Sequence, residues 1–132
     1  MTGQDAVRDD AVAIVMADPD GRITHWSSGA EQLFGYSADE ALGASLDLIV
    51  PADYRERHWL GFRRAMITGQ GRLDGAATNI PVQCKAGDVL AFPGRFAFVR
   101  DGHGRMVGAM AVYTTRRGGE EPWSSVGHSV LE

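Results

Sequence analysis

The spacing of the apolar residues changes at Gly69, and this change limits the available folds more than any other feature of the sequence. Beyond Gly69 the spacing shifts toward a period of two, which is the side-chain period of a strand. Three strands are predicted there, at about 72–84, 89–99 and 105–115. The two segments that separate them have the composition of hairpin turns, so the strands are expected to be consecutive and antiparallel; these turns are Lys85-Ala-Gly-Asp88 and Arg100-Asp-Gly-His-Gly104.

The chain before Gly69 opens with a predicted hairpin. The short apolar run Ala11–Ala17 is rich in residues that favour strands. The next segment, Asp18-Pro-Asp-Gly-Arg22, is predicted to form a turn, because proline fixes φ and glycine supplies a positive φ. The segment Ile23–Ser27 is then predicted to return as the second strand.

Short helices are predicted next. One covers about 29–34 and is expected to end at Gly35. Ser37 and Glu40 have the S-x-x-E spacing of a capping box, in which each residue satisfies a backbone donor of the other. This pair predicts a second short helix, which Gly43 is expected to end.

A longer helix is predicted from Pro51 to about Thr68. Proline suits the first turn of a helix because its missing N–H would have no partner there, and Asp53 is favourable near the same end. Gly69 is a typical residue for the position just after a helix. One apolar turn, at 46–50, precedes this helix.

The order of these elements predicts an α+β fold. Two strands, short helices, one longer helix and three strands favour a single antiparallel five-stranded sheet with the helices packed on one face. Pro81 and Pro93 each lack a backbone donor, so their strands are expected to be irregular there or to lie at an edge.

The 132 residues fit one domain. We expect a lead at 1–10, a single folded domain at 11–115 and a Gly- and Ser-rich linker or tail at 116–132, of which Leu131-Glu132 is a candidate cloning scar.

Charge and cysteine content narrow the function classes. The formal net charge of -4 gives no general attraction to nucleic acid or to an anionic membrane. Cys84, the single cysteine, excludes an internal disulfide framework and a multi-thiolate metal site. No apolar run approaches the ~20 residues of a membrane span, and the first ten residues lack the apolar centre of a secretion signal. A cytoplasmic location is therefore expected.

The predicted long helix carries a histidine in the middle of an apolar stripe. Tyr54, His58 and Phe62 are four residues apart, and Gly61 and Ala65 fall on the same arc. Two large rings, two small residues and a central imidazole would suit a flat cofactor. From spacing alone, however, a hydrogen-bonded histidine in or beside the core is the better interpretation of His58.

Two stretches resemble the PAS sensor family. They are Asp18-Pro-Asp-Gly-Arg-Ile-Thr-His-Trp26 and Ala30-Glu-Gln-Leu-Phe-Gly-Tyr-Ser-Ala-Asp-Glu-Ala-Leu-Gly43. The turns at 85–88 and 101–108 match the later turns of that family, so the resemblance covers roughly residues 11 to 115. It implies a PAS fold and a role in signal transduction.

The segment Val50-Pro-Ala-Asp-Tyr-Arg-Glu-Arg-His58 further resembles the haem-binding branch of that family, of the oxygen-sensor histidine kinase type. This resemblance implies that His58 is the axial ligand of iron in haem b. It also implies that Arg64 and Arg72 face the two haem propionates, where cations offset the carboxylates.

The other side of the expected pocket departs from the family pattern. Counted from His58, the positions of a distal arginine and a distal methionine are occupied by Thr78 and Ala76. Thr78 can offer one weaker hydroxyl hydrogen bond. Phe96 is expected in the core or the pocket wall, as are its neighbours Phe92 and Phe98, and a methionine such as Met110 is more often core filler than a sixth ligand.

Together these features predict a haem-binding PAS sensor domain rather than an enzyme. It would detect a diatomic gas (O2, CO or NO) or a redox state. A homodimer is expected, and the signal would pass to an effector outside this chain, such as a histidine kinase, a cyclase or a transcription regulator. The alternative is a haem-free PAS module for dimerisation or protein interaction, with another small organic ligand in its pocket.

Overall fold

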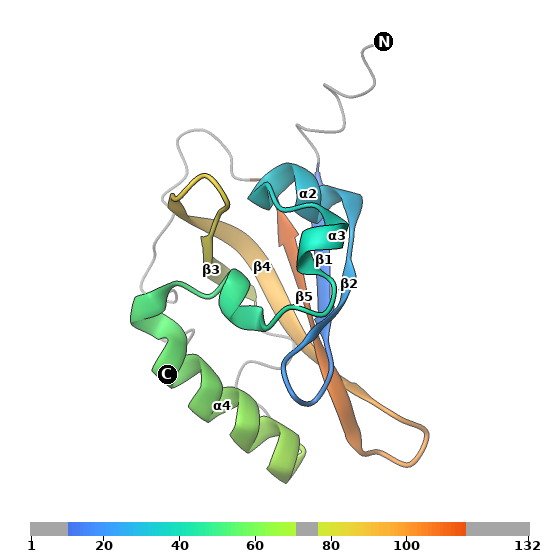
Figure 1. The fold of residues 1–132 in the computed structure, drawn as a ribbon. Helices are drawn as coiled ribbons and strands as arrows, with labels where there is room; N and C mark the ends of the chain where they lie inside the picture. The colour runs from blue at the N-terminus through green and yellow to red at the C-terminus, as the bar shows by residue number, and fades with distance from the viewer. Residues whose placement is uncertain (1–10, 71–76, 116–132) are drawn as a thin grey trace.

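The predicted strands pair into one antiparallel sheet. The structure is a computed structural model that describes residues 11–70 and 77–115. In these residues the strand order is β2-β1-β5-β4-β3, so that the first strand pairs with the last (Figure 1). The strands are β1 Val12–Ala17, β2 Ile23–Trp26, β3 Ala77–Gln83, β4 Val89–Arg100 and β5 Met106–Thr114.

Three of the predicted segments lie wholly or partly outside the described residues. These are the lead at 1–10, the tail at 116–132 and the first part of the strand expected at 72–84.

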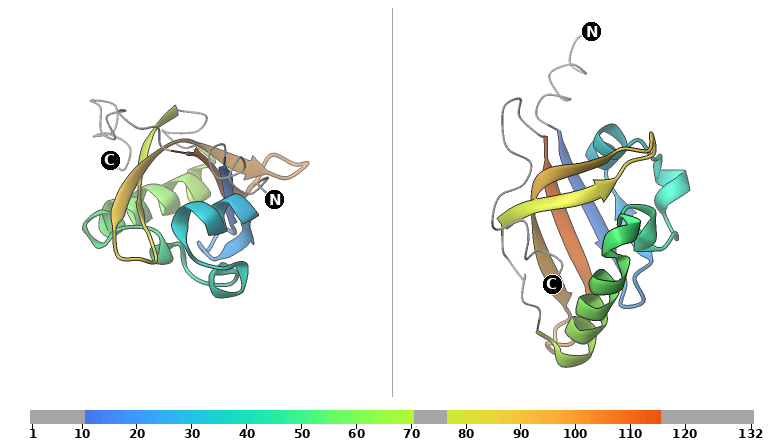
Figure 2. Two further views of the ribbon diagram at one scale, coloured as in Figure 1. Left: turned by 90° about the horizontal axis from the view of Figure 1, so that it is seen from above. Right: turned by 90° about the vertical axis from the view of Figure 1, so that its left-hand side faces the viewer.

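The described helices lie on one face of the sheet (Figure 2). This confirms the α+β architecture expected from the element order. The helical segments are α2 Ser28–Phe34, α3 Ala38–Ala41, the 3-10 turns η1 Leu46–Leu48 and η2 Ala52–Tyr54, and α4 Arg55–Thr68. None of them is long and apolar enough to cross a membrane.

Capping explains why the short helices form where they do. The side chain of Ser27 accepts a hydrogen bond from the backbone N–H of Ala30 at the start of α2. The predicted capping box of α3 is present, because Ser37 Oγ accepts from the N–H of Glu40 and Glu40 Oε1 accepts from the N–H of Ser37. These bonds satisfy donors that a helix start leaves unpaired.

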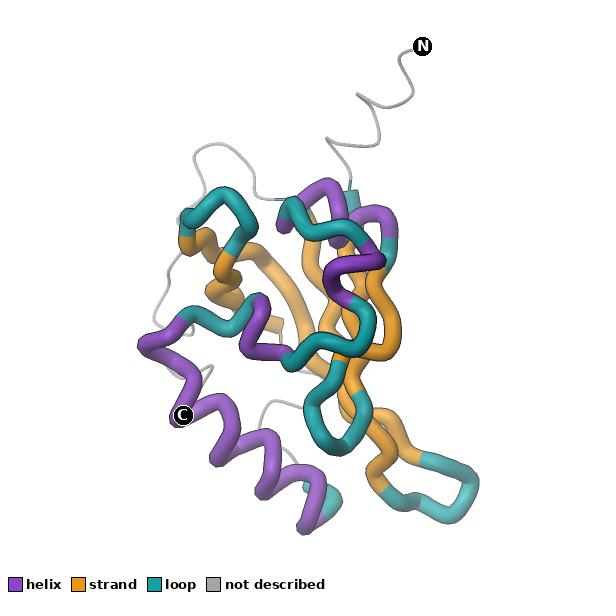
Figure 3. Tube along the Cα trace, viewed as in Figure 1, coloured by secondary structure: helices purple, strands orange, loops and turns teal. Residues whose placement is uncertain are grey.

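The long helix begins later than predicted. Tyr54 donates its backbone N–H to the carbonyl of Pro51, at 2.9 Å, which closes a tight 3-10 turn before α4. The α-helix therefore begins at Arg55 and ends at Thr68, where Gly69 takes a φ of 77° as the predicted cap. Figure 3 shows α4 as the longest helical segment.

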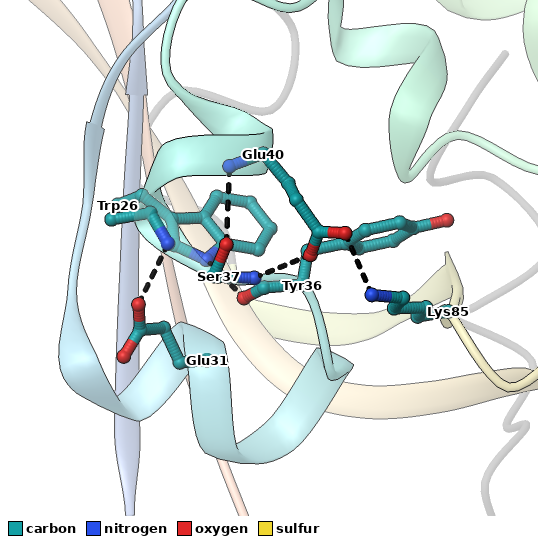
Figure 4. A network of polar contacts seen from close by, with 7 residues as sticks. Trp26, Glu31, Tyr36, Ser37, Glu40 and Lys85 are labelled. Carbon is teal, nitrogen blue, oxygen red and sulfur yellow. Dashed lines mark hydrogen bonds and ion pairs between the residues drawn. The ribbon is translucent and has the colours of Figure 1, made fainter.

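A polar network joins the short helices to the β3–β4 turn (Figure 4). Lys85 Nζ donates to Glu40 Oε2 at 2.6 Å, and the backbone N–H of Lys85 donates to the carbonyl of Phe34. On the other side, Trp26 Nε1 donates to the carbonyl of Tyr36 at 2.9 Å. These contacts hold α2 and α3 over one end of the sheet.

The core lies between those short helices and the sheet, with Phe34 at its centre. The Phe34 ring centroid is 5.8 Å from that of Trp26, 5.1 Å from Phe92 and 4.9 Å from Tyr113. A fully buried phenylalanine stabilises a fold by about 1.5–3 kcal/mol. Phe92 is therefore a core residue, in line with one of the two roles expected for it.

Strand β3 forms one edge of the sheet, as Pro81 led us to expect. Backbone N–H groups alternate between the two sides of a strand, and Gln83 directs its N–H away from β4, to the carbonyl of Ile49 at 2.9 Å. Pro81 has the same parity as Gln83, so its missing N–H removes no bond to β4. Pro93 lies just before the point where β4 begins to pair with β5, at Gly94.

Candidate functional site

A cavity of about 360 Å³ lies between α4 and the sheet. Volumes of about 300–1,000 Å³ are typical of small-molecule sites. The walls come from α4 and the segment before it and from strands β1, β3, β4 and β5, which are brought together by the fold. They include Val15 of β1, Ile49 of the segment before α4, His58 and Phe62 of α4, and Phe96 and Tyr113 of the last two strands.

His58 contributes an imidazole ring to the wall of this cavity. Its ring lies 5.8 Å from Phe62 in a stacked arrangement and 4.8 Å from Trp59 edge to face. Nδ1 of His58 is buried and has no hydrogen-bond partner among the described residues. Leaving a buried polar atom unpaired costs ~1–3 kcal/mol, so its presence calls for an explanation.

Burial keeps this imidazole neutral. It lowers the pKa of His58 from 6.5 to about 4, and the negative charge of Asp47 opposes that shift only in part. At neutral pH the ring therefore has one nitrogen with a free lone pair and one N–H. A neutral imidazole is the form that binds metals.

The predicted neighbours of His58 divide into two groups. Gly61 and Phe62 line the cavity. A Cβ added at Gly61 would meet no atom within 4 Å, so the helix surface is open at this point. Ala65 is buried in the core and Tyr54 is half-buried, and neither is part of the cavity wall. Tyr54 instead has the guanidinium of Arg57 5.6 Å from its ring centroid.

The cationic side chains at the cavity differ from the expected pair. Arg64 lines the cavity and is exposed, as its expected role requires, whereas Arg72 lies outside the described residues. Arg57 and Gln70 also line the cavity, and sequence reasoning missed both. The signal for Arg57 was available, because it is seven residues before Arg64 and so lies on the same side of the helix.

Thr78 is a second buried polar group without a partner. It is two residues before Ile80 on β3, and Ile80 faces the cavity, so Thr78 belongs to the same strand face. Its Oγ1 is buried and has no hydrogen-bond partner in the part of the chain that the structure describes. Thr78 itself is not part of the cavity wall. Ala76 lies outside the described residues.

The aromatic and sulfur side chains of β4 and β5 can now be placed. Phe96, as expected, and Phe98 line the cavity. Met110 borders it as well, but Met110 alternates with Ala109 and Ala111, which share the inner face of β5, so it is a poor candidate for a ligand inside the cavity. No group of three or more His, Cys, Asp and Glu side chains that could hold a metal ion occurs in residues 11–70 and 77–115.

Comparison with known proteins gives a family match and several partial relatives. The PAS fold family matches residues 6–121. The chain is 24% identical over 85 residues, 64% of its length, to the oxygen sensor protein DosP of Escherichia coli strain K12. It is 30% identical over 82 residues, 61% of its length, to an uncharacterized protein of Azorhizobium caulinodans. The match spans 11% of the length of each of these relatives.

Solved structures show the same fold. The PAS domain of a protein from Colwellia psychrerythraea superposes with a TM-score of 0.66 at 22% identity, covering 85% of this chain and 92% of that one. The PAS domain of the quorum-sensing receptor RpfR of Cronobacter turicensis, in complex with C12:0, gives a TM-score of 0.63 at 16% identity, covering 81% and 95%.

Proposed function

The chain belongs to the PAS fold family, and from this premise we propose that it is a sensory domain that would hold haem b between α4 and the sheet, with His58 binding the iron. One observation carries the proposal: a neutral, half-buried imidazole, whose Nδ1 is buried and unpartnered among the described residues, stands in the wall of a mostly apolar cavity. The partial likeness to an oxygen sensor protein supports it.

The residues around the cavity fit the chemistry of haem. Imidazole is a common axial ligand of haem iron. Phe62 and Phe96 give apolar walls, and the open surface at Gly61 leaves room beside the helix. Arg64 and Arg57 would pair with carboxylates at the exposed side of the cavity, and Arg72 is proposed for the same role. Tyr54 and Ala65 would support the helix face rather than touch the cofactor.

Bound haem would supply an iron atom that binds a diatomic gas (O2, CO or NO) or changes its redox state. The protein would hold the iron through His58 and exclude water with the apolar wall. Thr78 does not line the cavity, but its unpartnered Oγ1 lies on the strand face of Ile80, and we propose it as the one hydroxyl donor on the β3 side. The role is one of binding and signalling, without a catalytic step of its own.

The signal would leave the domain through a change in packing. A ligand that contacts two arrangements of α4 and β3 differently shifts the balance between them. We propose that residues 11–115 are the sensor domain, that the lead at 1–10 and the tail at 116–132 connect it to an effector outside this chain, and that the domain works as a homodimer. A histidine kinase, a cyclase or a transcription regulator would suit as effector.

The test is a haem titration of the purified full chain, followed by its Soret absorption. We expect stoichiometric binding by the parent protein and loss or displacement of the Soret band in His58→Ala. The control is His25→Ala, because His25 is exposed on β2 and lies away from the cavity. The proposal is wrong if the parent binds no stoichiometric haem, or if the spectrum of His58→Ala equals that of the parent.

A second candidate is a haem-free PAS module with an organic ligand. The mostly apolar wall and the nearby arginines would also suit an aliphatic carboxylate, and the similar RpfR domain has been solved with C12:0. Titration with C12:0 in place of haem separates the two candidates. Saturable binding of C12:0 by a protein that takes up no haem would favour this second function.

A further inference from the structure

Trp59 ties α4 to two other parts of the chain. Its Nε1 donates a hydrogen bond to Asp47 Oδ1 of η1 at 2.7 Å. Its ring packs on Gly21 in the β1–β2 turn, where an added Cβ would collide with the indole. Gly21 also takes a φ of 84°, which only glycine adopts at little cost. The close packing of Trp59 on the β1–β2 turn therefore requires glycine at position 21.

The two segments that receive Trp59 are themselves joined through the backbone. Leu46 donates its N–H to the carbonyl of Gly21 at 2.9 Å, and Arg22 forms a β-bridge with Ser45. Ser45 Oγ accepts the N–H of Asp47 at 3.0 Å. We call this unit, made of the β1–β2 turn and residues 45–47, the corner. Because backbone hydrogen bonds hold the corner together, we infer that it is a rigid surface against which α4 packs.

A second residue of α4 attaches to the same region. Arg55 donates from Nη2 to the carbonyl of Asp47 at 3.1 Å and from Nε to the carbonyl of Val50 at 3.0 Å. Arg55 and Trp59 are four residues apart, so both lie on one side of the helix. The first half of α4 is thus held along that side.

On its other side, Trp59 contacts the residues of the cavity wall. Its ring lies 4.8 Å from the His58 ring and 5.4 Å from the Phe62 ring, both nearly perpendicular. The indole is therefore placed between the corner and the imidazole. Because α4 carries both Trp59 and His58, we expect a rotation or shift of the helix that moves His58 to strain the bond to Asp47 and the packing of the ring on Gly21.

From this arrangement we propose that Trp59, through its bond to Asp47, is the positioning residue for His58. It fixes where the imidazole stands in the cavity, and so sets the fraction of molecules in which the ring is ready to bind. That the bound group is haem rests on the proposed function, whereas the placement of His58 by Trp59 does not depend on which group binds. Apparent affinity falls in proportion to the fraction of molecules in the binding-ready state.

Three variants separate the effect of the Trp59–Asp47 hydrogen bond from the effects of the Asp47 charge and of the aromatic ring at position 59. Trp59→Phe removes the donor and keeps an aromatic ring, and Asp47→Ala removes the acceptor. Asp47→Asn keeps an acceptor oxygen without the charge and should restore the parent behaviour. The matched control is Trp26→Phe, which removes another indole hydrogen bond, to the carbonyl of Tyr36, at a residue that does not line the cavity and makes no bond to α4.

The first measurement is made on the haem-free full chain. Spectra of ¹⁵N-labelled histidine report the ring signals of His58, assigned by their loss in His58→Ala. We expect these signals to shift or broaden in Trp59→Phe and Asp47→Ala, and to stay at the parent positions in Asp47→Asn and Trp26→Phe. Parent-like His58 signals in Asp47→Ala would overturn the proposal, and this variant is tolerable because the Asp47 side chain is 43% exposed.

The second measurement is the dissociation constant of haem for the same variants. Loss of this hydrogen bond predicts a measurable increase of up to about fivefold in Trp59→Phe and Asp47→Ala. Equal increases in Asp47→Asn or Trp26→Phe would contradict a positioning role. If the His58 signals respond as expected but no protein binds haem, the positioning role is supported and the haem assignment fails, so the two failures are distinguishable.

Discussion

His58 combines two properties that are costly on their own. Burial lowers its pKa from 6.5 to about 4, so that charging the ring within the fold is unfavourable, and its Nδ1 has no partner among the described residues. The sequence could predict the location of this residue, because its spacing from Phe62 and Gly61 follows from helix geometry. It could not predict the missing hydrogen bond, because that depends on residues from other elements, such as Ile49 and Phe96.

The pH dependence of stability follows from the same residue. The pKa of folded His58, about 4, lies below the ordinary value of 6.5, so between these values the unfolded chain binds a proton that the folded chain does not. The stabilising effect of the neutral ring is full above pH 6.5 and is lost as the pH falls toward 4. We expect the free energy of unfolding to fall by up to ~1.4 kcal/mol per pH unit from this group.

Urea denaturation of the haem-free protein at several pH values measures this slope. His58→Phe should have a shallower slope between pH 6.5 and 4, whereas the exposed control His25→Gln should keep the parent slope. Parallel curves for the parent and His58→Phe would show that the imidazole does not stay neutral in the fold.

At the level of elements, α4 serves both the fold and the cavity. Its end could be predicted from Gly69, but its start could not, because the tight turn before it depends on the bond from Tyr54 to Pro51 rather than on residue preference. The corner that holds the helix was also missed. Its two contact residues, Asp47 and Gly21, have no spacing relation to Trp59 that a sequence pattern would reveal.

Gly61 offers a test in which stability and binding move in opposite directions. Leucine is favoured over glycine in a helix by ~0.8 kcal/mol, and open space surrounds the position, so Gly61→Leu should stabilise the free protein. The same side chain would extend over the cavity, and we expect haem affinity to fall by about tenfold or more, since crowding a packed site costs ~1–3 kcal/mol.

Denaturation curves and haem titrations of the same preparations give both quantities. Gly61→Ala is the control, because it gains helix preference while adding only one methyl group. Unchanged affinity in Gly61→Leu would place the bound haem away from this face of α4.

For the whole molecule, the element order predicted one antiparallel sheet with helices on one face, and this prediction is confirmed. The sequence did not show that β1 pairs with β5, since that pairing joins residues about a hundred positions apart. The cavity depends on this pairing, because Val15 and Tyr113 reach it from those two strands. On the helix side of the cavity, His58, Gly61 and Phe62 were therefore predictable from helix spacing, whereas the opposite wall required the assembled sheet.

Filling the cavity should stabilise the entire domain. A ligand that binds only the folded chain, at one hundred times its dissociation constant, adds ~2.7 kcal/mol, which for a chain of this size raises the Tm by roughly 10 °C. We expect this rise with haem in the parent and its absence in His58→Ala, measured by thermal melting followed by circular dichroism. An equal rise in both proteins would locate the bound haem at another surface.

The outer edge of β3 has a consequence for assembly. An open strand edge is a template on which a neighbouring chain can add its own strand, and such growth leads to swapped dimers or fibrils. Here Pro81 has no N–H to offer, and that of Gln83 is already given to Ile49. An incoming strand would find no donor at either position, so this part of the sheet is closed to extension. A second copy is therefore not expected to add a strand at these two positions.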